Sequence, residues 1–171
     1  PASLTHNPQG NWVSRSHWVG VDLGEDRNYT LRAGRINVPY GIRSIEHTLW
    51  VRQRTRTDSN SSQQHGAALS YNAEKWRGEI MAVVGNLQLS PGDYREQGYI
   101  GFLEHTPVDK LAIGVSSQVL HSAYDVQFAT PTYRHSHGFF GRWSPFEMLV
   151  LSAEYDLLYR SQKTSGKTSV Y

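Results

Sequence analysis

The chain has 171 residues, enough for one domain over residues 1–171, and its net charge of +2 implies no strong electrostatic field. No basic cluster interleaves with aromatic residues at a recognisable motif, so no nucleic-acid partner is expected. Cysteine is absent, which excludes disulfides and thiolate metal sites. Hydrophobic residues make up 38% of the sequence and aromatic residues 12%, a composition that suits a barrel with one apolar face and a wet interior.

Period-two alternation of apolar and polar residues dominates the chain, and turn residues separate the alternating runs. The run 98–106 has an ambiguous parity, because Ile100 and Phe102 compete with Tyr99 and Leu103. The polar tail after residue 160 ends in what looks like the start of another strand. Strands are predicted over residues 11–23, 29–38, 64–71, 76–85, 98–106, 111–120, 132–143 and 148–159.

The connections alternate in length. Tight turns are predicted near residues 26, 73, 108 and 145, and longer loops over 41–63, 86–97 and 121–131. The longest loop follows a Pro39-Tyr40-Gly41 stop, and a short helix is considered over residues 42–50. The sequence contains no apolar run of about 18 residues, which a membrane-spanning helix needs, and none of its segments is expected to be a signal peptide. Because the chain starts at a proline in a polar segment, we expect a mature product or an excised piece.

Strands of about ten residues with one apolar and one polar face, joined by alternating short and long connections, are typical of bacterial outer-membrane barrels. A sheet in lipid must close on itself, because lipid cannot satisfy backbone groups. The predicted fold is therefore all-β: an antiparallel up-and-down transmembrane β-barrel, or about eight strands of a larger one. The alternative is a sandwich or a lipocalin-like barrel with its polar face outside. A dry core would bury Glu154 and Asp156 at high cost, whereas a wet lumen would not.

The run Gly34-Arg35-Ile36-Asn37-Val38-Pro39-Tyr40-Gly41 resembles the Gly-Arg/Lys-x-x-x-Pro-aromatic-Gly rim motif of phosphate-selective and related outer-membrane porins. The runs 64–71 and 76–79 are similar to the hairpin that follows in those proteins. The resemblance implies a passive diffusion channel whose constriction is shaped by an inward-folded loop. Such porins have about 16–18 strands, whereas eight strands, if closed, leave an interior filled by side chains. The chain is therefore expected to be a fragment of such a channel or a small closed barrel.

Charged residues supply the candidate pore-lining and constriction sites. On the loop, Arg52, Arg54 and Arg56 share a parity, so an extended segment would make one cationic face that attracts anions. The alternative is a solvated loop that contacts lipopolysaccharide or nothing. On the polar faces of the strands, charges would line the pore, form cross-barrel ion pairs or simply rigidify the wall. The candidate residues are Arg43, Arg52, Arg54, Arg56, Arg77, Glu79, Arg134, Arg142, Glu154 and Asp156, with Arg32 beside them.

Other chemistries find little support in the sequence. His135 and His137 share a face near His105 and His121, but no acidic residue lies at ligand spacing, so no metal site is predicted. Ser116 or Ser136 would have to pair with a histidine of opposite parity, which points to the other face. No enzyme activity is therefore expected. The aromatic residues Trp12, Trp18, Trp76, Tyr99 and Trp143 are interpreted as membrane-interface residues.

The leading hypothesis is a porin-like channel of the bacterial outer membrane for small hydrophilic solutes, with a mild preference for anions. Its partners would be the lipid bilayer, lipopolysaccharide and these solutes, with no nucleic acid and no cofactor. A homo-oligomer is left open, because nothing marks an interface. The second hypothesis is a small closed barrel that acts as a membrane anchor or interaction protein, and the third is a soluble ligand-binding barrel.

Overall fold

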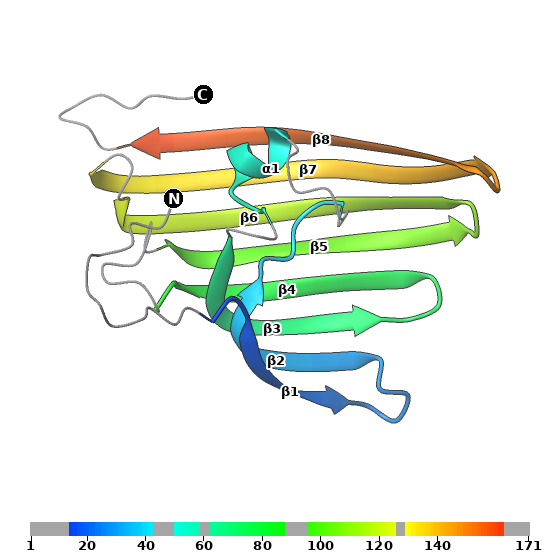
Figure 1. The fold of residues 1–171 in the computed structure, drawn as a ribbon, viewed down its shortest axis with the longest axis horizontal. Coiled ribbons are helices and arrows are strands. Elements are labelled where there is room, and N and C mark those ends of the chain that lie inside the picture. Colours follow the sequence, from blue (N-terminus) through cyan, green and yellow to red (C-terminus); the bar gives the residue numbers. More distant parts are fainter. Residues whose placement is uncertain (1–13, 43–49, 59–61, 88–95, 126–128, 163–171) are drawn as a thin grey trace.

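A computed structural model describes residues 14–42, 50–58, 62–87, 96–125 and 129–162. They form one antiparallel eight-stranded sheet whose strand order follows the sequence, and a short helix lies over one of its faces (Figure 1). Within these ranges, no helix has the length and hydropathy needed to cross a membrane. The elements are β1 His17–Leu23, β2 Tyr29–Asn37, α1 Trp50–Thr55, β3 Gln63–Asn72, β4 Trp76–Gly85, β5 Glu96–Val108, β6 Leu111–Asp125, β7 Thr130–Phe146 and β8 Leu149–Gln162.

The up-and-down arrangement confirms the predicted fold class. Each strand pairs with its neighbours in the sequence, and the registers run through directly opposite residues such as Val21 with Leu31 and Val115 with Phe139. The strand ends that the tight turns join lie at one end of the sheet, and the strand ends that the longer connections join lie at the other (Figure 1). The described sheet is open, with β1 and β8 as its edges. Closure into a barrel therefore remains a prediction.

Several strands are longer than predicted. The strand β6 continues to Asp125 and β7 begins at Thr130, so the predicted loop 121–131 was largely wrong. The polar residues there keep the pairing, with Ser122 opposite Thr132 and Asp125 opposite Thr130. Backbone hydrogen bonds do not need apolar side chains, so polar composition alone did not mark the end of the strand. The strand β1 begins at His17, whereas residues 11–13 and the tail 163–171 lie outside the described residues.

The described helix covers Trp50–Thr55, which includes Arg52 and Arg54 of the stretch that would make one cationic face only if it were extended. The predicted helical stretch 42–50 falls mostly on residues 43–49, which lie outside the described residues. The correction matters for the site, because helical spacing sends neighbouring arginines in different directions.

The two faces of the sheet differ sharply in chemistry. One face exposes apolar side chains, among them Ile80, Phe139 and Leu157 at 55%, 67% and 59% exposure. The other face is polar and partly buried beneath the segment that follows β2. The ambiguity in β5 is resolved, because Tyr99 and Leu103 are exposed with the apolar set while Ile100 is 1% exposed and lies on the polar side. We call these the apolar face and the polar face.

Aromatic side chains pair across strands near both ends of the apolar face. Near the tight turns, the rings of Tyr29 and Tyr71 are 4.9 Å apart and those of Trp76 and His105 are 4.1 Å apart. At the opposite end, His121 stacks on Tyr133 at 4.4 Å. The expectation for Trp18 was wrong: it is paired with Gly34 on the polar side, and the Arg32 guanidinium lies over its ring. Trp12 lies outside the described residues.

Candidate functional site

Two described parts of the segment that follows β2, residues 38–42 and 50–58, lie over the polar face, and together we call them the strap. Its first part packs through apolar side chains. Val38 and Tyr40 are 6% and 2% exposed and join a buried cluster with Met81, Ile100 and Leu120. These partners come from β4, β5 and β6, so the strap crosses the middle of the sheet rather than projecting from its edge. The described parts of the loop that the sequence singled out lie over the polar face.

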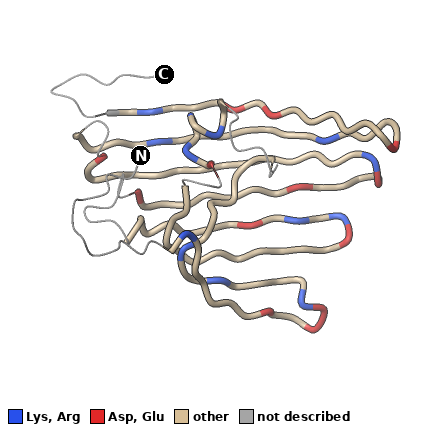
Figure 2. Tube along the Cα trace, in the orientation of Figure 1, with Lys and Arg blue, Asp and Glu red and all other residues tan. Residues whose placement is uncertain are grey.

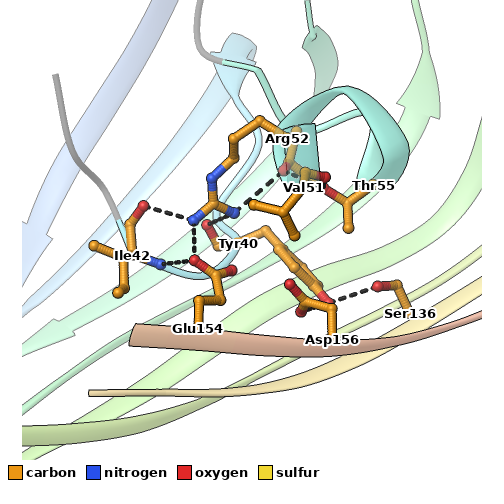
Figure 3. A network of polar contacts seen from close by, with 9 residues as sticks. Tyr40, Ile42, Val51, Arg52, Thr55, Ser136, Glu154 and Asp156 are labelled. Atoms are coloured by element: carbon orange, nitrogen blue, oxygen red, sulfur yellow. Dashed lines mark hydrogen bonds and ion pairs between the residues drawn. The ribbon is translucent and has the colours of Figure 1, made fainter. Parts of the chain in front are cut away.

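The strap reaches the last two strands through the Tyr40 side chain. The Tyr40 hydroxyl donates a hydrogen bond to Asp156 Oδ1 at 2.7 Å and lies 2.6 Å from the Ser136 hydroxyl (Figure 3). Because the Tyr40 hydroxyl has one proton and donates it to Asp156, the Ser136 hydroxyl must be the donor in its hydrogen bond with Tyr40. Burial raises the pKa of the Tyr40 hydroxyl above its ordinary value, which keeps it protonated and able to donate.

Arg52 on α1 joins both parts of the strap to β8. Its Nη2 lies 2.5 Å from Glu154 Oε2 and donates to the Ile42 carbonyl at 2.7 Å (Figure 3). Its Nη1 donates to the Tyr40 carbonyl at 3.2 Å, and the Ile42 amide donates to Glu154 at 3.2 Å. Both charged side chains are nearly buried, at 6% and 7% exposure. Paired buried charges with this many hydrogen bonds fix a geometry, because loss of either partner leaves a buried charge unpaired.

A second set of charges holds the far end of α1. Arg56 Nη1 lies 2.8 Å from Asp125 Oδ2 and 3.1 Å from Glu96 Oε1. Arg134 binds both oxygens of Glu96, through Nε at 3.0 Å and Nη2 at 2.7 Å. The Thr55 carbonyl, which has no acceptor role within the helix, accepts from Arg134 Nη1 and from Gln118 Nε2. The strap is thereby tied to β5, β6 and β7 as well as to β8.

The expected single cationic face of the strap is wrong. The helical turn places Arg52 and Arg56 toward acidic partners on the sheet, while Arg54 points away from it and is exposed. The Arg54 guanidinium lies over the ring of Trp50, 5.1 Å from its centre. Arg43, also a candidate, lies outside the described residues.

The remaining candidates form ion pairs between strands. Arg32 on β2 lies 2.5 Å from Glu79 on β4. Glu104 on β5 accepts from Arg77 at 2.7 Å and from Arg142 at 2.8 Å. Arg142 belongs to β7 and reaches Glu104 across β6. The β6 residues paired with Arg142 and Glu104 are the small Ala112 and Gly114, and the Phe140 ring lies over Gly114.

Each described candidate on the wall thus contacts a charge or hydroxyl on another segment. Figure 2 shows charged residues of both signs along the strands and at the tight turns. The arrangement agrees with ion pairing that rigidifies the wall, one of the three expectations for these residues. Their exposure to a pore remains a prediction.

The sequence did not single out several residues of this network: Glu96, Glu104, Gln118, Asp125 and Tyr40 as a hydrogen-bond donor. Glu104 shares the parity of Ile100, so a resolved register of β5 would have found it. Glu96 and Asp125 fell in predicted loops and became visible only when the strands proved longer.

A polar cluster lies on the apolar face. Ser117 Oγ lies 2.9 Å from His137 Nδ1 and 3.3 Å from the Tyr99 hydroxyl. Ser116 and Ser136 are buried on the polar face, which confirms that they point away from His135 and His137. Among the described residues, no group of three or more His, Cys, Asp or Glu side chains is arranged to hold a metal ion.

Comparison of the chain with protein-family models, with curated proteins and with solved structures finds no match. The class supported by the fold is an all-β up-and-down sheet with a strap across its polar face. Any function must be argued from that geometry.

Proposed function

We propose that this chain forms part of the wall of an outer-membrane β-barrel channel through which small hydrophilic solutes diffuse passively. The observation that carries the proposal is the chemical difference between the two faces of the sheet. The apolar face is exposed over most of its area, while the polar face holds a strap fixed by nearly buried ion pairs. In a barrel whose apolar face meets lipid, the strap lies on the lumen side and narrows the passage.

The exposed apolar face supports contact with lipid. Val115, Phe139 and Leu157 are 44%, 67% and 59% exposed and lie on three successive strands. Soluble monomers rarely expose contiguous apolar patches larger than a few hundred Å². In a bilayer the same patch lies in hydrocarbon, and the aromatic pairs at its two ends lie at the depths where aromatic girdles are found.

The strand lengths also suit a bilayer. A tilted spanning strand needs about 9–11 residues. The strands β3 and β4 have 10 residues each, and β6 and β7 have 15 and 17. The strands β6 and β7 extend past β4 at both ends of the sheet. The strap is anchored to Asp125 and Glu96 at the long-loop end. The strap would therefore sit toward the long-loop side of such a barrel.

A mild anion preference is part of the proposal, and Arg54 supports it. The charges of Arg52 and Arg56 are offset by Glu154 and by Glu96 with Asp125. Arg54 points away from the sheet and, within the described part of the chain, is in no ion pair. One cation at a constriction raises the local concentration of anions without excluding cations.

The second candidate function is a closed, non-conducting barrel that anchors or binds a partner. The position of the strap favours it if the barrel has only eight strands, because such a barrel has just enough interior for its own side chains. A strap over β5–β8 would then fill the interior. The two candidates therefore differ in strand number and in conductance.

Planar-bilayer recordings test the proposal. The protein, expressed from its complete reading frame and folded in detergent, should give discrete current steps in KCl. A salt gradient should give a reversal potential of the sign that anion preference requires, and Arg54→Glu should shift it toward cation preference. Heat-modifiable gel migration verifies that each sample is folded. A folded protein that gives no current contradicts the channel and supports the closed barrel.

A further inference from the structure

The helix α1 has one anchored side and one side that faces away from the sheet. Arg52 and Thr55 on the anchored side are 5% and 0% exposed. Trp50 and Arg54, one turn apart, lie on the other side; Trp50 is 67% exposed, and the Arg54 guanidinium lies 5.1 Å from its ring centre. The outward side of the strap therefore presents a flat aromatic surface next to a cation.

Trp50 differs from the tryptophans of the wall. Trp76 and Trp143 lie on the apolar face near the tight turns, where an interfacial girdle accounts for them. Trp50 instead belongs to the strap over the polar face, where a channel would hold water. An indole that is mostly exposed in such a place contributes little to packing, and aromatic side chains beside a few placed polar groups are typical of ligand sites.

We infer that Trp50 and Arg54 together form a solute-selecting platform for planar aromatic carboxylates. The inference rests on the proposed channel function and names the solute class that the constriction prefers. The planar guanidinium of Arg54 offers paired N–H donors to a carboxylate, and the indole of Trp50 offers a surface on which an aromatic ring stacks. A small inorganic anion uses only the first contact, and a neutral aromatic uses only the second.

Two carboxylates of equal charge and similar size separate these contacts: benzoate is flat and aromatic, and cyclohexanecarboxylate is neither. Each carboxylate is added to a planar bilayer in which the protein carries a chloride current. The concentration that blocks half of this current is then measured. We expect the value for benzoate to be about fivefold lower, since aromatic stacking adds roughly that factor beyond area burial.

Variants assign the effect to the two residues. Trp50→Ala should bring the two half-blocking concentrations together, whereas Trp50→Phe should retain part of the benzoate preference. Arg54→Gln should weaken block by both carboxylates by a similar factor, and Arg54→Lys should weaken it less. Lys110→Gln removes a cation from the exposed turn between β5 and β6 and should leave both concentrations unchanged.

The outcomes separate this inference from the channel on which it depends. Equal block by the two carboxylates, or a benzoate preference that survives Trp50→Ala, overturns the platform while the chloride current still supports the channel. A folded protein without any chloride current overturns the channel, and the platform falls with it.

Discussion

The guanidinium of Arg52 on α1 and the carboxylate of Glu154 on β8 are 2.5 Å apart, although 102 positions separate them in the sequence. The contact joins the strap to an edge strand of the sheet. Because Arg52 also binds the carbonyls of Tyr40 and Ile42, one side chain holds both described parts of the strap. The position of the strap therefore depends on this ion pair more than on any local preference of a six-residue helix.

Reversal of the charge at Arg52 should release the strap. Arg52→Glu sets two carboxylates against each other, and breaking a buried pair costs roughly 3–5 kcal/mol in a dry interior, less where lumen water reaches the groups. We expect faster limited proteolysis within residues 38–58 and a larger single-channel conductance. The exchange Arg52→Glu with Glu154→Arg should restore slow proteolysis.

The exposed Gln53 on the same helix supplies the matched control. Gln53→Glu also places a carboxylate on α1, but it leaves Arg52 paired with Glu154, so proteolysis of the strap should stay slow. Equal proteolysis of Arg52→Glu and Gln53→Glu would show that the ion pair does not hold the strap.

Two arginines of β7 should differ in their contribution to stability. Arg134 is 2% exposed and binds both oxygens of Glu96, whereas the side chain of Arg142 is 36% exposed. Arg134→Ala removes the cation that binds both oxygens of the buried Glu96 carboxylate, and it should lower the free energy of unfolding by about 3 kcal/mol. Arg142→Ala should cost about 1 kcal/mol or less, because Glu104 keeps Arg77 and the pair is partly solvated. Urea unfolding in detergent measures both, and a larger loss for Arg142→Ala would contradict the assignment of buried and solvated pairs.

Alternation predicted the eight strands because each strand has two chemically different faces, and this is a local property of the sequence. Contacts between segments that are distant in the sequence determined where the strands end and which polar residues are buried. The strand β6 runs on to Asp125 because β7 continues to pair with it, and Asp125 is buried because Arg56 reaches it. A local polar pattern cannot distinguish a paired polar strand from a loop.

The sequence identified many residues of the site but not which of them pair with one another. The arginines of the strap and the acids of β8 were both found, but the sequence offered no means to pair Arg52 with Glu154 or Arg56 with Asp125. The helix has too few residues to form from propensity alone, and the extended alternative gave the arginines a shared face. Acidic partners on three strands, β5, β6 and β8, settle the conformation instead.

High pH should weaken the strap through Tyr40. Burial, the larger effect, and the neighbouring Asp156 raise the pKa of Tyr40 in the folded protein, whereas the unfolded value is near 10. Tyr40 therefore keeps its hydroxyl proton to a higher pH in the folded protein than in the unfolded chain. Its contribution to the free energy of unfolding is complete below about pH 10 and declines as the pH rises further. Urea midpoints between pH 8 and 11 should fall less in Tyr40→Phe than in the unchanged protein. Parallel declines would mean that Tyr40 ionises equally easily in both states.

Two exposed aliphatic residues of similar accessibility test whether the apolar face meets lipid. Ile80 lies in the middle of β4 and Val108 lies beside a tight turn, and they are 55% and 59% exposed. In a bilayer, Ile80→Arg places a charge near the midplane at a cost of about 2–4 kcal/mol, and Val108→Arg places it near the interface at about 0–1 kcal/mol. In water, both substitutions are surface changes that typically stay within about 0.5 kcal/mol. Urea titrations of folding into lipid vesicles should therefore separate the two variants by at least about 1 kcal/mol, and equal costs would place this face in water and exclude the proposed membrane barrel.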